Sequence, residues 1–253
     1  MILIEACVNS VESAIAAEIG GALRVELCEN LYEGGTTPSA GTILLTSEKV
    51  SIAVNVLIRP RGGDFLYSDL EFEVMKKDIL FCKQNRVNGV VIGILKEDGM
   101  VDVERTQELV NLASPMSVTF HRAFDMVANP FQALEDVIAS GCQRILTSGL
   151  RNKIWQGQEM IADLVQRANG RIIILAGSGI TSDNVEKMIK RTGVTEIHAS
   201  GRSSFPSKMV YKNHDVLMGG LQEIPEFENI FTNTEKIRLI VQAANRDVNT
   251  IKE

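Results

Sequence analysis

The sequence predicts a single (β/α)8 TIM barrel, an α/β fold in which eight parallel strands close into a ring surrounded by eight helices. Three observations predict it. The chain has 253 residues, and one such barrel needs roughly 250. Eight short apolar segments of strand character alternate with segments of helical periodicity. A weak internal repeat, in which a glycine ends a helix and a charged residue three positions later opens a strand, occurs at Gly21, Gly141 and Gly193.

The first forty residues contain a strand, a helix and a second strand. The strands are Ile2–Cys7 and Arg24–Cys28, and each ends in the pattern Glu-x-Cys. Between them, Asn9–Ile19 has helical character, with Asn9 as its cap and Glu12 three residues later, as in a capping box. Strands joined by a helix are parallel neighbours, so both Glu-x-Cys patterns lie at the C-terminal ends of adjacent strands. That end is where α/β folds carry their chemistry.

The later elements continue the alternation. Ser68 and Glu71 form a second capping box, and Asn129-Pro130 combines a capping side chain with proline at the first helical position. Further strands are expected at 52–58, 89–95, 117–120, 144–146, 172–175 and 195–199, and further helices at 43–49, 68–85, 103–113, 130–141, 155–167 and 182–191. Residues 203–230 are expected to be irregular and a last helix to cover 232–248, so that residues 1–253 form one domain.

The main alternative is an open, doubly wound sheet, because alternating strands and helices resolve mostly to these two architectures. No Gly-x-Gly-x-x-Gly fingerprint follows the first strand, which disfavours the dinucleotide-binding version of that sheet. We therefore expect the closed barrel.

Composition excludes several classes of partner. The net charge is −6, the pI is about 5.3, and no run of lysines or arginines argues for nucleic acid. No apolar run approaches the ~20 residues of a membrane span, and the first residues lack the basic region of a signal peptide. Four cysteines, at positions 7, 28, 82 and 142, do not resemble a disulfide framework in a chain of this length. We therefore expect reduced thiols, a cytoplasmic location, and neither nucleic acid nor a membrane as partner.

Loops that follow the strands are the functional loops of a barrel, and four arginines stand in them. They are Arg59, Arg61, Arg122 and Arg202. Arginine forks bind carboxylate and phosphate, so these residues, with Asp64 in the same loop as two of them, predict a site for a small anionic ligand. The alternative is that the arginines pair with the carboxylates of Glu5, Glu26, Asp64 and Asp125, since buried charges must be paired whatever the function.

Glycine-rich loops follow the seventh and eighth strands, at Gly177-Ser178-Gly179 and Ser200-Gly201. This is the usual phosphate position in barrels, where backbone N–H groups face the anion. Ser148, after the sixth strand, could form a third side of this anion-binding site. The alternative is that these glycines only permit tight turns.

Histidines end the fifth and eighth strands. His121 and His198 could each act as a general base, a proton donor or a metal ligand, or could be hydrogen-bonded structural residues. Arg24, Arg144 and Glu196 open their strands at the opposite end, so we interpret them as a charge network that closes the barrel floor.

Cys7 and Cys28 end neighbouring strands, which lie ~4.8 Å apart. Two thiols at matched depth could hold one soft ion, and two thiolates suit Cu(I). The alternative is that both are small buried hydrophobic residues, as we expect for Cys82 and Cys142. No Cys-x-x-Cys pattern strengthens the metal hypothesis.

Several long segments together carry a family resemblance. They are Arg24–Cys28, Glu33–Ser39, Ile58–Phe65, Thr119–Asp125, Asn129-Pro130 and Leu146–Gly149. In these segments the chain resembles the CutC family, barrel proteins named for copper homeostasis, from about residue 1 to about residue 202. The resemblance implies a cytoplasmic (β/α)8 barrel that forms homo-oligomers. It also implies a Cu(I) site at two cysteines, which correspond here to Cys7 and Cys28.

Two functions remain open from the sequence, beside a third alternative, a scaffold or partner-binding barrel, which no obvious interaction tail supports. The first is a copper homeostasis protein that binds Cu(I) through Cys7 and Cys28. The second is a barrel enzyme, or former enzyme, acting on a small phosphorylated or carboxylated molecule. In the second, the arginines and glycine-rich loops would bind the anion, while Glu26 and His121 would carry acid–base chemistry. A mouth rich in arginine fits an anionic ligand better than it fits a bare copper chaperone.

Overall fold

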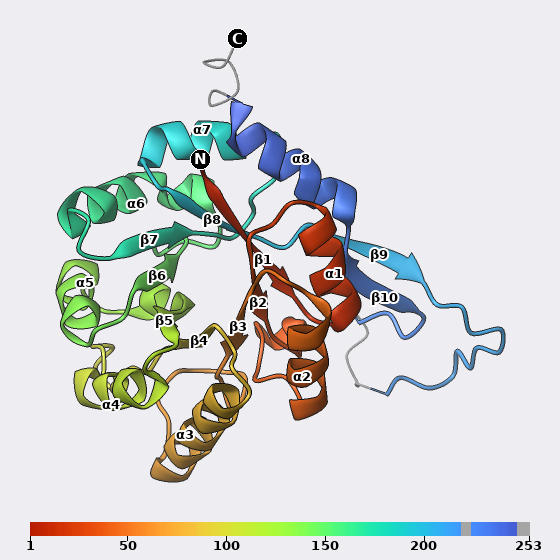
Figure 1. The fold of residues 1–253 in the computed structure, drawn as a ribbon, viewed down its shortest axis with the longest axis horizontal. Coiled ribbons are helices and arrows are strands. Elements are labelled where there is room, and N and C mark those ends of the chain that lie inside the picture. The colour runs from red at the N-terminus through yellow and green to blue at the C-terminus, as the bar shows by residue number, and fades with distance from the viewer. Residues whose placement is uncertain (219–223, 247–253) are drawn as a thin grey trace.

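The computed structural model describes residues 1–218 and 224–246, and eight parallel strands close into a barrel in chain order (Figure 1). The predicted (β/α)8 fold is therefore confirmed. The barrel strands are β1 (Leu3–Val8), β2 (Arg24–Leu27), β3 (Ala53–Leu57), β4 (Gly89–Ile92), β5 (Ser117–Phe120), β6 (Arg144–Thr147), β7 (Ile173–Ala176) and β8 (Glu196–Ala199).

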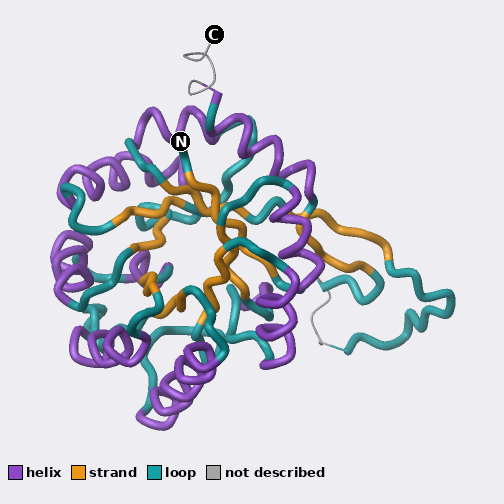
Figure 2. The backbone as a smooth tube through the Cα atoms, in the orientation of Figure 1, coloured by secondary structure: helices purple, strands orange, loops and turns teal. Residues whose placement is uncertain are grey.

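Helices form the outer ring around these strands (Figure 2). They are α1 (Val11–Ile19), α2 (Ala40–Lys49), α3 (Asp69–Gln84), α4 (Val103–Ala113), α5 (Pro130–Ala139), α6 (Ile154–Ala168), α7 (Val185–Thr192) and α8 (Thr234–Ala244), with short 3-10 helices η1 (Leu31–Glu33) and η2 (Arg122–Met126). The predicted capping box of Ser68 and Glu71 is present, and Asn129 caps α5 with Pro130 at its first position. These starts depend on local chemistry, which explains why the sequence locates them.

Side chains of the barrel strands alternate between two environments. On β1, Ile4, Ala6 and Val8 belong to the hydrophobic core between strands and helices. Glu5 and Cys7, on the opposite face, point into the barrel interior. Since β1 pairs with β2 with Cys7 opposite Glu26, polar side chains of both strands meet inside the ring.

The barrel floor is a buried charge network, as predicted. Arg24 forms ion pairs with Glu5 and Glu196, and Arg144 Nε lies 2.9 Å from the Glu196 carboxylate. Arg24, Glu5 and Glu196 are almost completely buried. Pairing of this kind compensates charges that would otherwise be costly to remove from water.

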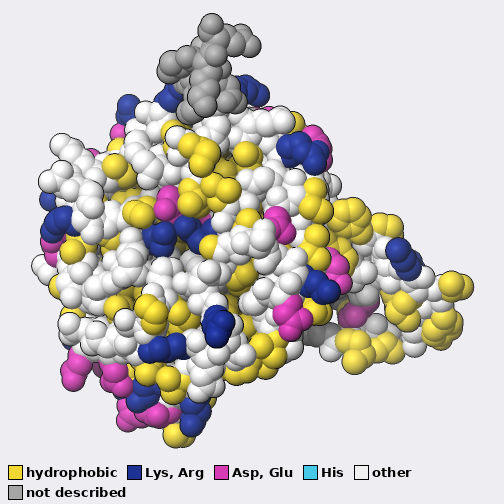
Figure 3. Space-filling view, in the orientation of Figure 1, with side chains coloured by type: hydrophobic (Ala, Val, Ile, Leu, Met, Phe, Trp, Pro, Cys, Tyr) yellow, Lys and Arg dark blue, Asp and Glu magenta, His cyan; other side chains and the backbone are white. Residues whose placement is uncertain are grey.

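The segment 203–230, predicted to be irregular, instead begins and ends in strands. β9 (Arg202–Pro206) and β10 (Glu228–Thr232) form an antiparallel ribbon beside α1. Its pairing joins residues about 25 positions apart without a short turn signal, so local patterns did not indicate it. Residues 207–218, described between the two strands, contain no helix or strand, and exposed hydrophobic side chains gather on this arm at the right of Figure 3.

The last helix begins at Thr234, two residues after the start of the predicted segment, with Asn233 as its N-cap. It ends at Ala244 with Asn245 as its C-cap, earlier than predicted, and residues 247–248 of the predicted helix lie outside the described residues. No helix in 1–218 or 224–246 has both the length and the apolar character required to cross a bilayer.

Candidate functional site

A cavity of about 510 Å³ lies at the C-terminal end of the barrel. Its lining residues follow or end most of the barrel strands, from Cys7 on β1 to His198 on β8. The ring closure thus brings together side chains that are nearly two hundred residues apart, as the fold predicts for this end.

The two predicted metal ligands lie in contact. Cys7 Sγ is 3.7 Å from Cys28 Sγ, and Cys28 Sγ also lies 3.5 Å from the carbonyl oxygen of Val8. Cys28 is buried, whereas Cys7 is half-buried and lines the cavity. The hydrogen bond with Cys28 and burial both raise the pKa of the Cys7 thiol well above its usual value. Without a metal, Cys7 is therefore a neutral thiol at neutral pH.

His198 joins this pair from β8, the strand that closes the ring against β1. Ligand atoms of Cys7, Glu26 and His198 all lie within 4.8 Å of one another. His198 Nδ1 lies 2.8 Å from Glu5 Oε1, and its Nε2 lies 3.7 Å from Glu26 Oε2. Burial by itself would lower the pKa of His198, but the charge of Glu26 and hydrogen bonds with Cys7 and Glu5 raise it well above its usual value.

From the sequence, His198 was one candidate for a general base, a proton donor or a metal ligand, but it was not assigned to the cysteine site. The pairing of β8 with β1 sets His198 opposite Glu5. That pairing exists only because the barrel closes, so a pattern within one strand could not show it. The available signal was the position of His198 at the end of a barrel strand, on the face shared with Ser200.

Glu26 is buried beside His198. Burial raises its pKa to about 8, although the charge of His198 opposes the shift. The carboxyl group therefore holds its proton to a higher pH than an ordinary glutamate does, which suits a proton donor.

His121 lies in the same cavity lining but has a different protonation state. Its Nδ1 accepts a hydrogen bond of 3.1 Å from the backbone N–H of Ala123, and the Phe65 ring lies 5.0 Å away. Burial and the charge of Arg59 lower the pKa of His121 to about 3. The neutral ring then carries its proton on Nε2, so this geometry favours hydrogen-bond donation over proton abstraction. Its catalytic role stays a prediction.

Three of the four predicted arginines, Arg59, Arg122 and Arg202, line the cavity, whereas Arg61 does not. Arg59 lines it, but its guanidinium donates to the carbonyl oxygens of Glu33, Gly35 and Gly63 at 2.7–2.8 Å. Arg61 pairs with Glu71 and with Asp64, and neither Arg61 nor Asp64 lines the cavity. The expectation that these two residues face the mouth is therefore corrected: local carboxylates turn Arg61 away.

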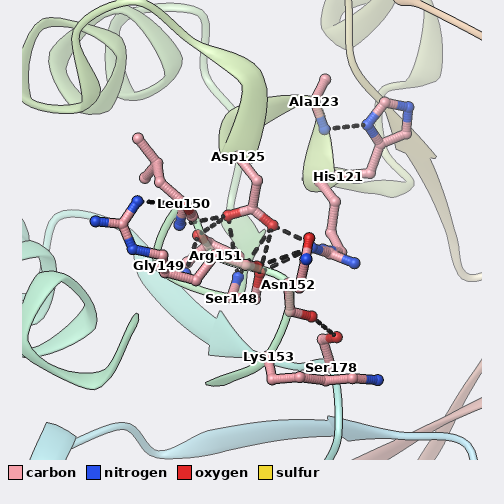
Figure 4. A network of polar contacts seen from close by, with 12 residues as sticks. His121, Ala123, Asp125, Ser148, Gly149, Leu150, Arg151, Asn152, Lys153 and Ser178 are labelled. Carbon is pink, nitrogen blue, oxygen red and sulfur yellow. Dashed lines mark hydrogen bonds and ion pairs between the residues drawn. The ribbon is translucent and has the colours of Figure 1, made fainter. Parts of the chain in front are cut away.

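Asp125 organises the loop after β6 (Figure 4). Its carboxylate accepts hydrogen bonds from Thr147 Oγ1, the Ser148 N–H and hydroxyl, and the Leu150 N–H, at 2.5–3.1 Å. Arg122 donates to Asp125 at 2.7 Å and to Ser148 Oγ at 2.8 Å. Arg122 and the buried Ser148, both predicted to bind an anion, thus have protein partners that hold this loop in place.

The glycine-rich loops divide into packing and lining residues. A side chain at Gly177 would meet His198 at 3.1 Å, and one at Gly201 would meet Ile237 at 2.6 Å, so both glycines permit close packing. The predicted residues that line the cavity here are Gly179, Ser200 and Arg202, and they are joined by Ser178 and Lys153. Sequence reasoning missed Lys153, because it lies between elements and carries no motif.

Comparison with known proteins identifies the family. The family model described as CutC family matches residues 2–203. The chain belongs to the CutC family. A CutC family protein of Parabacteroides distasonis is 49% identical over 94% of this chain and 99% of its own length. Relatives named copper homeostasis protein cutC homolog are 48% identical in Mus musculus, over 97% of this chain and 90% of theirs, and 47% identical in Homo sapiens, over 94% and 87%.

Solved structures agree with this CutC assignment. The crystal structure of a CutC protein from Streptococcus agalactiae has a TM-score of 0.75 and 36% identity, covering 79% of this chain and 99% of that one. A phosphoribosylanthranilate isomerase from Thermotoga maritima, 12% identical with a TM-score of 0.58 over 97% of this chain and 100% of its own, shares the barrel fold alone. The CutC match ends at residue 203, so it contains every predicted site residue, whereas β10 and α8 lie beyond it.

Proposed function

We propose that this protein serves copper homeostasis by binding Cu(I) between Cys7 and Cys28 at the mouth of the barrel. The contact between the two sulfur atoms carries the proposal. At 3.7 Å one ion can reach both sulfurs, and soft thiolate ligands select Cu(I) over hard cations. Cys7 lines the cavity, so the ion has a route to the pair.

The surroundings fit such an ion. His198 is held through Nδ1 by the Glu5 carboxylate, an arrangement typical of metal-ligating histidines, and Nε2 remains on the side of Cys7 and Glu26. Glu26, whose raised pKa favours the protonated form, is a weak ligand, so Cys7, Cys28 and His198 form the donor set that we expect to hold Cu(I).

The raised pKa of Cys7 gives the proposal a pH dependence. Binding must remove the Cys7 thiol proton and one ring proton of His198, whose pKa is also raised, and both removals become easier as the pH rises. The affinity for Cu(I) is therefore expected to increase with pH across the neutral range, with protons released on binding.

Competition titration tests the site. Cu(I) is added anaerobically, under reducing conditions, against a chromophoric Cu(I) chelator. The Cys7→Ser, Cys28→Ser double variant is expected to lose more than the roughly 10- to 100-fold that changes around a ligand cost. The control is Cys82→Ala, Cys142→Ala, which removes two buried thiols away from the cavity. Equal affinities of wild type and the serine variant would end the proposal.

A second candidate function is acid–base catalysis on a small phosphorylated or carboxylated substrate. One observation favours it: Glu26, with a pKa near 8, and His121, with a pKa near 3, line one cavity. Opposed pKa shifts in one cavity are typical of catalytic sites. Glu26 would donate a proton, and His121 Nε2 would donate a hydrogen bond to a substrate oxygen.

A substrate screen tests the second candidate. The protein is incubated with pools of phosphorylated and carboxylated small molecules, and turnover is followed by NMR. Turnover by wild type that Glu26→Gln abolishes is expected. Absence of turnover in every pool, or equal turnover by the variant, would reject catalysis while leaving the Cu(I) proposal intact.

A further inference from the structure

Charged side chains line the cavity on several sides, including Arg59 beside Glu33 and Arg122 paired with Asp125. The carboxyl groups of Glu26 and Glu33 lie on its wall beside β2, whereas Lys153 and Arg202 lie on the wall that follows β6 and β8. Neither Lys153 nor Arg202 forms an ion pair with a carboxylate in the described part of the chain. Two exposed, unpaired cations on one wall of a concave site attract an anion.

Backbone N–H donors in the loop after β7 also favour an anion at this wall of the cavity. Ser178 and Gly179 both have left-handed backbones, with φ of 76° and 85°. The Ser178 carbonyl accepts from the Ile154 N–H at 3.0 Å, and the Gly179 carbonyl accepts from Asn184 Nδ2 at 2.9 Å. In a trans peptide the next N–H is antiparallel to the carbonyl, so the N–H groups of Gly179 and Ile180 point away from α6 and α7. No acceptor among the described residues meets either N–H group.

Lys153 is held against this backbone. A Cβ added to Gly179 would lie 3.0 Å from Lys153 Cδ, so the lysine stem runs along the glycine. Ser178 Oγ donates to the Asn152 carbonyl at 2.6 Å, joining the loops after β6 and β7, and the Asp125 network fixes the first of them (Figure 4). Donors that are already in place need little ordering when a ligand binds.

We propose that Lys153, Arg202 and the backbone N–H groups of Gly179 and Ile180 form a binding site for a phosphate monoester. Two cations and convergent N–H donors suit a dianionic oxyanion with several acceptor oxygens better than a singly charged carboxylate. The site deepens the second candidate function, since it would hold the phosphate of that substrate. Its binding requires neither turnover nor copper.

Inorganic phosphate is the probe for this site. Binding to wild type is measured by calorimetry, with a Kd expected on the order of 1 mM. Lys153→Met and Arg202→Met are each expected to weaken it by about 10-fold, because each removes a charge-assisted hydrogen bond. Both side chains are exposed, so the variants should fold, which circular dichroism checks. Lys77→Met on α3 removes the same charge from an exposed position and should leave phosphate binding unchanged.

The outcomes separate this site from both proposed functions. Undetectable phosphate binding by wild type, or equal binding by the Lys153→Met, Arg202→Met double variant, would overturn it. Acetate binding as tight as phosphate would overturn the phosphate assignment. The serine variant at Cys7 and Cys28 should bind phosphate normally, and a Lys153→Gln, Arg202→Gln double variant, which adds no thioether, should bind Cu(I) normally, so failure of one proposal leaves the other standing.

Discussion

Replacing Glu26 by glutamine tests whether the barrel mouth contains a buried neutral carboxyl group. Glu26 is 6% exposed, and burial raises its pKa from the ordinary 4.5 to about 8 against the opposing charge of His198. The folded protein thus binds this proton more tightly than the unfolded chain does. The contribution of Glu26 to stability is then greatest below pH 4.5 and is lost as the pH rises through about 8.

The size of the effect follows from the two pKa values. Glutamine keeps the shape of the side chain but does not titrate, so the unfolding free energy of the variant does not fall with pH for this reason. Each pH unit between the pKa values adds up to about 1.4 kcal/mol to the difference in unfolding free energy. From about pH 5 to about pH 8 the Glu26→Gln variant should therefore gain up to about 4 kcal/mol relative to wild type.

Urea unfolding followed by circular dichroism at several pH values measures this difference. Changed hydrogen bonding in the variant shifts all points equally, so the slope against pH is the decisive quantity. Glu48→Gln on the exposed face of α2 is the matched control and should show no such slope. A Glu26→Gln difference that stays flat between pH 5 and pH 8 would refute the reasoning.

Two further substitutions probe how the site is held. A Cβ at Gly93 would clash with the His121 ring, so Gly93→Ala should lower the unfolding free energy by about 1–3 kcal/mol. Gly41→Ala, where a Cβ meets open space, is the control and should cause no such loss. Equal urea midpoints for the two variants would contradict this prediction. Burial alone would raise the pKa of Glu5, but its histidine hydrogen bond and the charge of Arg24 lower it to about 2. Its ionised form therefore stabilises the fold above pH 4.5, by up to about 3 kcal/mol, and this is lost as the pH falls through about 2. In urea unfolding, Glu5→Gln should lower the unfolding free energy by up to that amount at pH 7 and by less near pH 3. Equal decreases at the two pH values would contradict this prediction.

The fold was predictable from the sequence because its signals are local. Apolar strands alternate with helices eight times around the ring, and caps and helix-ending glycines, where they occur, act within a few residues. The ribbon of β9 and β10 was missed because its strands pair across a long connection. Self-association and a cytoplasmic location stay predictions.

The candidate site was only partly predictable. The Cys7–Cys28 contact follows from one short βαβ unit, so its two strand ends could be placed side by side. Their positions after strands placed Arg59, Arg122 and Arg202 at the cavity, but their partners could not be predicted, because backbone carbonyls, as for Arg59, leave no mark in a sequence. Lys153 was missed for a similar reason: its position depends on contact with Gly179 from the next loop.

The sequence by itself determined the barrel, the family resemblance and the pair of strand-end cysteines, since periodicity, caps and short connections act over few residues. Only the tertiary structure decided which polar groups share an environment. Ring closure brings His198 to Glu5 across 193 positions, so burial raises the pKa of Glu26, while Glu26, Cys7 and Glu5 raise the pKa of His198 against its burial. Desolvation depends on everything packed around a group, so no pattern along the chain encodes it directly.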